Sequence, residues 1–187
     1  MSLRRIKQEI VEELKAELYN IIEEALVEES KTVKINGLEW MTTNLDDVRS
    51  VPLIEDDEEW EKAGDEGRPA CCYYNNKRGN GVLYNWFALK HLEKGGWRVP
   101  TYKDFKTLEG QTIKNRMGVQ FNGSRYYTGK FENTGMDEYW WSSSEKKFVF
   151  SKEKNVSDAW YWYISASDEL GTNVSNKSAG FSVRLVK

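Results

Sequence analysis

The composition of this chain changes abruptly at about residue 31. All fourteen Gly, all three Pro and all eight Trp lie after that point. The segment before it is rich in Glu, Lys, Leu and Ile, which favour helix, and it contains no residue that breaks one. The sequence therefore predicts a single helix about 40 Å long over residues 1–31, followed by a separate domain over residues 32–187.

The predicted helix carries a narrow apolar stripe. Its first half follows a spacing of three, four and four, and its second half follows the alternating three and four of a heptad repeat. So narrow a stripe does not stabilise an isolated helix, which therefore packs either against its own domain or in a parallel coiled coil. We favour the coiled coil because the helix is terminal. The mixed core side chains do not meet the rule for dimers, which leaves the number of strands open. The residues expected to hold the coiled coil together are Ile10, Val11, Leu14, Leu18, Ile21 and Ala25.

The second domain must build its core from aromatic rings. Hydrophobic residues make up only 39% of the chain, yet aromatic residues make up 13%. The dipeptide Asn36-Gly37 is typical of a tight hairpin, so a strand is expected on either side of it. The acidic stretch within residues 46–66 lacks the glycine and the ligand spacing of a calcium loop, and we expect a solvated loop or short helix there.

Two short helices are expected next. Residues 81–96 are amphipathic and end at a Gly-Gly pair. Thr101 and Asp104 have the spacing of a capping box, so a second helix should begin after Thr101. Beyond Gly110 the chain contains strand-length runs such as YWWSSS, KFVFS, DAWYWYISA and GFSVRLVK. This order predicts an α+β domain with its helices first and its strands late.

The residue types present argue against an enzyme. A net charge of -3 without a basic patch argues against a nucleic-acid partner. The only histidine, His91, is insufficient for a multi-His metal site within one chain, and no phosphate-binding or metalloprotease motif occurs. The adjacent Cys71 and Cys72 do not suit a disulfide framework, and at least one is expected to be a buried structural thiol. We expect no catalytic residue, no metal and no cofactor.

Seven motifs of the second domain occur in one order. They are WMTTNL (Trp40 to Leu45), PACCYYNN (Pro69 to Asn76), GVLYNWFAL (Gly81 to Leu89), GWRVPTYKDFKTL (Gly96 to Leu108), YWWSSS (Tyr139 to Ser144), AWYWYIS (Ala159 to Ser165) and GFSVRLVK (Gly180 to Lys187). Together they resemble the Fibrobacter succinogenes major paralogous domain, a member of the C-type lectin-like superfamily. The resemblance covers residues 32–187 and implies two short helices on a small twisted antiparallel sheet, with the chain ends paired and long loops that carry any binding function.

Alternation along the strand-like runs predicts which side chains face the core. In the run at 159–165, Tyr161 and Tyr163 should lie on the face opposite the core. The residues predicted on the core side are Trp160, Trp162 and Ile164 in that run, and Phe181, Val183 and Leu185 in the last one.

Two activities of the superfamily are not carried over to this chain. Animal C-type lectins bind sugars through calcium held by Glu-Pro-Asn or Gln-Pro-Asp and Trp-Asn-Asp motifs, and none of these occurs here. Formylglycine-generating enzymes have a segment similar to GWRVPT but use paired redox-active cysteines late in the chain. Cys71 and Cys72 lie early instead.

The C-terminal part is also similar to phage tropism determinants and other targets of diversity-generating retroelements. The matching features are WSSSE, AWYWYI, the polar loop at residues 165–180 and VRLV. In those proteins the exposed positions form a ligand-binding face displayed on a trimer. The corresponding face here would comprise Tyr161, Tyr163, Ser165, Asp168, Asn173, Asn176 and Lys177.

The resemblance implies a phage virion appendage, a head or tail fibre or a capsid decoration, that presents this domain to a host-surface protein or glycan. The helix would trimerise the chain or dock on another virion protein. The lack of a Sec signal suits a protein made in the host cytoplasm and released by lysis, and no apolar run is long enough to span a membrane, so no membrane partner is expected. A bacterial cell-surface binding module of the same family and a purely structural decoration protein are the alternatives.

Overall fold

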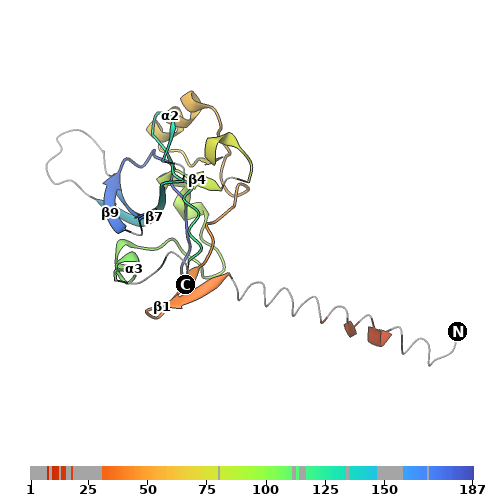
Figure 1. Ribbon diagram of the computed structural model, residues 1–187. Helices are drawn as coiled ribbons and strands as arrows, with labels where there is room; N and C mark the ends of the chain where they lie inside the picture. The colour runs from red at the N-terminus through yellow and green to blue at the C-terminus, as the bar shows by residue number, and fades with distance from the viewer. Residues whose placement is uncertain are drawn as a thin grey trace. The chain divides into compact units, whose positions relative to one another are not determined.

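The computed structural model separates the chain into two compact units, residues 1–32 and residues 33–187. The described residues of the first unit up to residue 18 are helical. In its described part the second unit is α+β, with small antiparallel sheets and few helices (Figure 1). The structure describes residues 8, 10–12, 14–15, 18, 31–79, 81–110, 113, 117–133, 135–146, 158–167 and 169–187.

A tight hairpin precedes the rest of the second unit. Strands β1 (Thr32–Ile35) and β2 (Leu38–Met41) form a two-stranded sheet. Asn36 and Gly37 between them have φ angles of 49° and 86°, the left-handed region that a two-residue type I′ turn requires at both positions. The predicted hairpin is therefore confirmed.

Helix α2 (Asp57–Asp65) occupies the acidic stretch. The side chain of Asp56 caps it by accepting a hydrogen bond from the backbone N–H of Glu59. The acidic residues in the first turn stabilise the helix, because its N-terminal end carries a partial positive charge. The acidic run therefore marks the start of a helix, one of the two outcomes that the sequence allowed.

The predicted helix over residues 81–96 is wrong in its first half. Strand β4 (Val82–Tyr84) pairs antiparallel with β3 (Cys71–Tyr73), and the short 3-10 helix η1 (Tyr74–Asn76) lies between them. Pairing with β3 holds this stretch extended despite its amphipathic pattern, because tertiary contacts outweigh local preference.

Two short helices follow, and each begins at a side-chain cap. The 3-10 helix η2 (Trp86–His91) is capped by Asn85 and ends before the Gly-Gly pair that was expected to end it. Helix α3 (Tyr102–Lys106) begins with the complete capping box predicted at Thr101 and Asp104. The local capping rule thus located α3 correctly.

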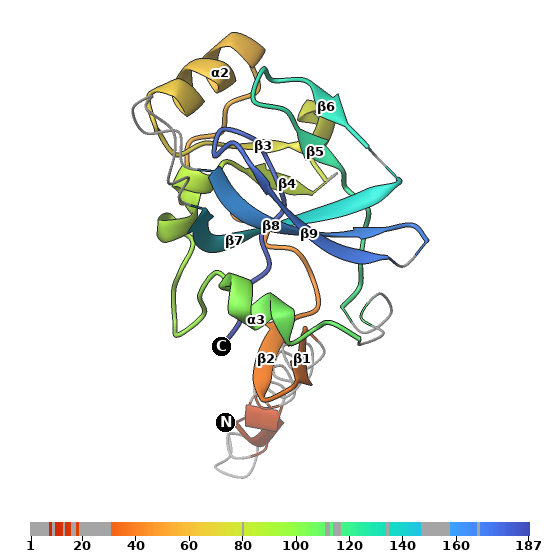
Figure 2. The same cartoon turned by 90° about the vertical axis from the view of Figure 1, so that its left-hand side faces the viewer.

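The later strands form a short hairpin and the main sheet. The main sheet has the order β7-β8-β9, and in Figures 1 and 2 helix α3 lies below it and α2 above it. Strand β9 lies within residues 165–180, which the sequence analysis took for a loop, because backbone pairing with β8 makes a strand of a segment with weak strand preference. The strands are β5 (Ser124–Arg125), β6 (Phe131–Glu132), β7 (Asp137–Lys146), β8 (Asp158–Ser165) and β9 (Leu170–Ser175).

One face of the main sheet packs on α3. Trp162 and Ile164 are buried there as predicted, and the Phe105 ring of α3 stacks on the Trp162 ring with 5.7 Å between centroids. Trp160 points to the same face but is only half-buried, with its ring 4.7 Å from that of Tyr102. The predicted face is therefore correct, although Trp160 is less buried than Trp162 and Ile164.

The last ten residues pass through the middle of the domain without forming a regular strand. Their backbone exchanges pairs of hydrogen bonds with Arg125, Tyr84, Arg98 and Glu39, which belong to four separate segments. The strand predicted for GFSVRLVK is thus replaced by a segment that ties the domain together. The second predicted run, KFVFS, lies outside the described residues. The buried residues include the predicted Phe181, Val183 and Leu185 and also Ser182, Arg184 and Val186.

Candidate functional site

Three tyrosines share the face of the main sheet opposite α3. In the register of β7 with β8, Tyr139 pairs with Tyr163 and Trp141 pairs with Tyr161. Directly paired residues of an antiparallel sheet project to the same side. The centroid of the Tyr161 ring lies 6.3 Å from that of Tyr163 and 5.8 Å from that of Tyr139. We define Tyr139, Tyr161 and Tyr163 as the tyrosine face.

The tyrosine face is half-buried, whereas the sequence analysis expected Tyr161 and Tyr163 to be exposed. The last segment of the chain covers part of it. The Phe181 ring lies 4.8 Å from the Tyr161 ring and 5.3 Å from the Tyr139 ring. Burial raises the pKa of the Tyr161 hydroxyl, and Tyr163 and Asp137 raise it further. Ring contacts on several sides hold these tyrosines in place.

The three hydroxyl groups of the face differ in their bonding. The Tyr139 hydroxyl accepts a hydrogen bond from Asn133 at 2.8 Å and donates one to Asp137 at 2.9 Å. Within the described residues, the hydroxyls of Tyr161 and Tyr163 have no hydrogen-bond partner. Each of these two hydroxyls is therefore able to donate and accept a hydrogen bond to a ligand.

Strand β9 completes this face. Gly171 pairs with Tyr163, and a Cβ at Gly171 would lie 2.4 Å from Cζ of that ring, so only glycine allows the ring to lie across β9. Asn173 pairs with Tyr161 and is exposed. Its Oδ1 accepts the backbone N–H of Val174 at 2.8 Å, which leaves the amide nitrogen for an outside partner.

The structure separates the other predicted ligand residues. Ser165 is half-buried at one end of the main sheet, where its Oγ accepts the backbone N–H of Glu169 at 3.2 Å. Asn176 follows β9 at the opposite end, where Ser175 pairs with Ala159. Asp168 lies outside the described residues. Ser165 thus borders the tyrosine face, and Asn176 does not.

Lys177 has a structural environment of its own. Its Nζ lies 4.2 Å from the centroid of the Trp86 ring and 3.1 Å from a carboxylate oxygen of Glu145, and its side chain is only 12% exposed. The sequence predicts this lysine on the exposed ligand face. That placement is wrong, because the lysine joins the end of the main sheet to η2.

Tyr139 and Gly171 belong to this face, although the sequence did not predict them there. The alternation of YWW in β7 is the signal that could have placed Tyr139 opposite the buried Trp140. No comparable signal exists for Gly171, because its importance depends on which residue of β8 lies opposite.

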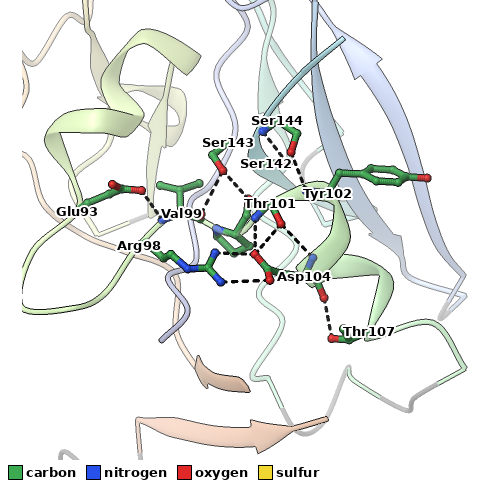
Figure 3. A network of polar contacts seen from close by, with 11 residues as sticks. Glu93, Arg98, Val99, Thr101, Tyr102, Asp104, Thr107, Ser142, Ser143 and Ser144 are labelled. Carbon is green, nitrogen blue, oxygen red and sulfur yellow. Dashed lines mark hydrogen bonds and ion pairs between the residues drawn. The ribbon is translucent and has the colours of Figure 1, made fainter. Parts of the chain in front are cut away.

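The GWRVPT motif forms the polar network in Figure 3. The Arg98 guanidinium donates to both carboxylate oxygens of Asp104, at 2.6 and 3.2 Å, and the backbone N–H of Thr101 donates to the same carboxylate at 2.7 Å. Burial acts to raise the pKa of Asp104, but the hydrogen bonds from Arg98 and Thr101 outweigh it and lower that pKa. The motif therefore fixes the start of α3.

The WSSSE motif docks on the same place. Strand β7 leaves its register with β8 between Trp141 and Glu145, so the three serines form a bulge. The backbone N–H of Ser143 donates to the carbonyl of Pro100 at 2.8 Å, and the Ser144 hydroxyl accepts the backbone N–H of Tyr102 at 3.0 Å (Figure 3). Both motifs thus contribute to the packing of α3 against β7.

The first unit leaves its predicted seam uncovered where it is described. Ile10, Val11, Leu14 and Leu18 are 49%, 46%, 59% and 58% exposed. The other two predicted seam residues, Ile21 and Ala25, lie outside the described residues.

The remaining chemically notable groups are few. Cys71 and Cys72 are buried free thiols, and burial raises their pKa values to about 12 and about 11, so the expected structural role suits both. His91 is exposed at the end of η2. Among the described residues, no three His, Cys, Asp or Glu side chains gather as a metal site would require. Over the same residues, no helix combines the length and apolar character needed to span a membrane.

The comparison with known families covers the first half of the second unit. No curated protein matches this chain at a significant level. Residues 33–118 match the family model described as the Fibrobacter succinogenes major domain. The matched segment begins in β1 and includes the motifs up to GWRVPT and α3, so over residues 33–118 the chain is similar to the Fibrobacter succinogenes major domain family.

Proposed function

We propose that this protein is a non-enzymatic binding module of C-type lectin-like fold, carried as a trimeric phage virion appendage, that recognises a host-surface protein or glycan through the tyrosine face. The observation that carries the proposal is the pair of fixed rings at Tyr161 and Tyr163, whose hydroxyls lack a partner among the described residues. Tyrosines held in this way offer apolar contact area and a polar tip at low entropic cost.

The polar edge of the face supports a binding role. Asn173 is exposed beside Tyr161, and Ser165 borders the face at the end of β8. Asn and Ser side chains supply adaptable hydrogen bonds beside rigid aromatic anchors, a combination found in recognition surfaces. WSSSE and VRLV are similar to segments of phage tropism determinants. Because both motifs pack inside this domain, the similarity supports a shared fold.

The exposed apolar seam supports the trimer. Four apolar side chains of one short helical stretch are each about half exposed in the single chain. Contiguous exposed apolar side chains at helical spacing indicate a surface that is covered in the assembled state. A trimer would present three copies of the tyrosine face and increase the avidity for a repetitive host surface.

The test uses fluorescent full-length protein on a glycan array and on a panel of bacterial cells. Tyr163→Ala should lower the retained signal at least tenfold, because it removes an aromatic ring that would contact the ligand. The fold should be kept, because Tyr163 is not part of a core cluster. Tyr161→Phe should lower it less, because only the hydroxyl is lost and the contact with Phe181 stays.

Tyr127→Ala is the matched control. Tyr127 is 40% exposed on the turn between β5 and β6, and its loss should leave the retained signal unchanged. Equal signals for Tyr163→Ala and the unaltered protein would reject the tyrosine face as the ligand site. Retention of none of the proteins on any surface, together with stable incorporation into particles, would favour the structural decoration instead.

A further inference from the structure

A charged cleft is lined by residues that do not belong to the main sheet. Its volume is about 640 Å³, within the size range of small-molecule sites, roughly 300 to 1,000 Å³. Its walls come from the segment between β2 and α2, from β3 and the turn that follows it, and from the turn after η2. The lining residues with charged or hydroxyl side chains are Asp46, Asp47, Arg49, Ser50, Tyr73, Arg78 and Lys94.

Both carboxylate oxygens of Asp47 accept hydrogen bonds from residues in the wall of the cleft. One of its oxygens accepts the backbone N–H groups of Arg49 and Ser50, at 3.0 and 3.2 Å. The other accepts the Ser50 hydroxyl and the Lys94 ammonium, both at 2.9 Å. The hydrogen bond from Lys94 contributes most to lowering the pKa of Asp47, to about 2. Asp47 is therefore ionised at neutral pH and neutralises Lys94.

Two arginines of the cleft are left without such a partner. Arg49 and Arg78 are exposed, and neither guanidinium forms a hydrogen bond or an ion pair with any residue that the structure describes. The backbone of Arg49 is held by Asp47, so the root of this side chain is fixed. The charges of Asp47 and Lys94 neutralise each other. Among the lining residues, this leaves the positive charges of the two arginines and one negative charge, that of Asp46, in a chain whose net charge is -3.

Tyr73 adds a hydroxyl group to the same cleft. Its side chain is only 8% exposed and packs in the core around β3 and β4. Its hydroxyl has no hydrogen-bond partner among the described residues. Two guanidinium groups with a fixed hydroxyl form a donor set suited to an oxyanion, since arginine binds carboxylate, sulfate and phosphate groups through paired N–H donors.

We propose that this cleft is a binding site for a small polar molecule that carries an oxyanion, such as an acidic sugar. The anionic group lies between Arg49 and Arg78 and accepts the Tyr73 hydroxyl, and the remaining volume holds the uncharged part of the molecule. The site is separate from the tyrosine face and does not depend on the function proposed for it.

The test is saturation-transfer NMR on the full chain at low ionic strength, with glucuronate, glucose 6-phosphate and neutral glucose as probes. We expect both anions to give saturable signals and glucose to give none. Inorganic phosphate should displace the anions, and about 0.5 M sodium chloride should weaken them, because the interaction is electrostatic and lies near solvent. No preference for the anions over glucose would overturn the proposal.

The variants separate the cleft from the general charge of the protein. Arg49→Gln with Arg78→Gln should weaken the binding of glucuronate at least tenfold and leave the melting temperature unchanged, because neither guanidinium has a partner among the residues that the structure describes. Lys103→Gln with Lys130→Gln removes the same charge at two exposed sites elsewhere and should leave binding unchanged. Equal binding by the arginine variant and the unaltered protein, or equal losses in both variants, would overturn the proposal.

Discussion

At the scale of single residues, Arg184 is a fully buried cation in the last segment. It donates to the carbonyl of Met117 and, at 2.6 Å, to Oδ1 of Asn44, and Asn44 in turn donates to Glu138 at 2.8 Å. Burial lowers the pKa of Arg184 to about 10, which Glu138 opposes, so the side chain stays charged at neutral pH. Removing one member of such a network leaves buried polar groups without partners.

Arg184→Met should therefore lower the free energy of unfolding by about 3 to 5 kcal/mol, the range for breaking a buried charge pair. Urea denaturation followed by tryptophan fluorescence measures the loss. Arg68→Met is the control, since Arg68 forms ion pairs with Glu59 and Glu66 while 39% exposed, and its loss should cost much less than the loss of Arg184. Equal losses in the two variants would show that the buried network has no special weight.

At the scale of elements, α2 docks on the last segment through a close contact. The indole N–H of Trp60 donates to the carbonyl of Ser178 at 3.0 Å. One helical turn further on, a Cβ at Gly64 would lie 2.4 Å from both Cβ and Oγ of Ser178. Glycine thus lets the helix and the segment approach where any side chain would separate them.

Gly64→Ala should lower the free energy of unfolding by about 1 to 3 kcal/mol through this steric conflict. The sign is informative, because the same change in an exposed helix raises stability by about 0.5 to 1 kcal/mol. Calorimetry of the variant beside Glu61→Ala, at an exposed position of α2, measures the difference. A stabilised Gly64→Ala protein would mean that α2 does not pack this closely on Ser178.

At the scale of the whole molecule, the two units differ in how far their apolar side chains are buried. The described part of the second unit buries apolar and aromatic side chains in three clusters, whereas the described apolar residues of the first unit are about half exposed. We expect the apolar seam, of which the described residues are exposed, to be covered by further copies of the chain.

Light scattering after size exclusion should accordingly find a trimer for the full chain and a monomer for residues 31–187. Leu18→Asp should weaken the trimer by placing a charge in the seam. Ala16→Asp adds the same charge at a position that the heptad spacing puts outside the seam, and it should leave the trimer intact. A trimeric 31–187 fragment would assign oligomerisation to the second unit.

Local signals in the sequence were sufficient for the features that depend on a few neighbouring residues. The Asn36-Gly37 turn and the Thr101 capping box were predicted correctly, because both are decided by backbone conformation and hydrogen bonds within four residues. The alternation in β8 likewise separated Trp162 from Tyr161. The change of composition at about residue 31 lies beside the boundary between the two compact units.

What depends on distant segments was decided only by the tertiary structure. Residues 82–84 became a strand because β3 lies beside them, and β9 became one because β8 does. The last segment covers Tyr161 with the ring of Phe181. Contacts with Trp86 and Glu145 hold Lys177 away from the predicted ligand face. The sequence by itself determined turns, caps and alternation, since these are local. Only the folded chain determined exposure and pairing, because both depend on contacts between residues far apart in the sequence.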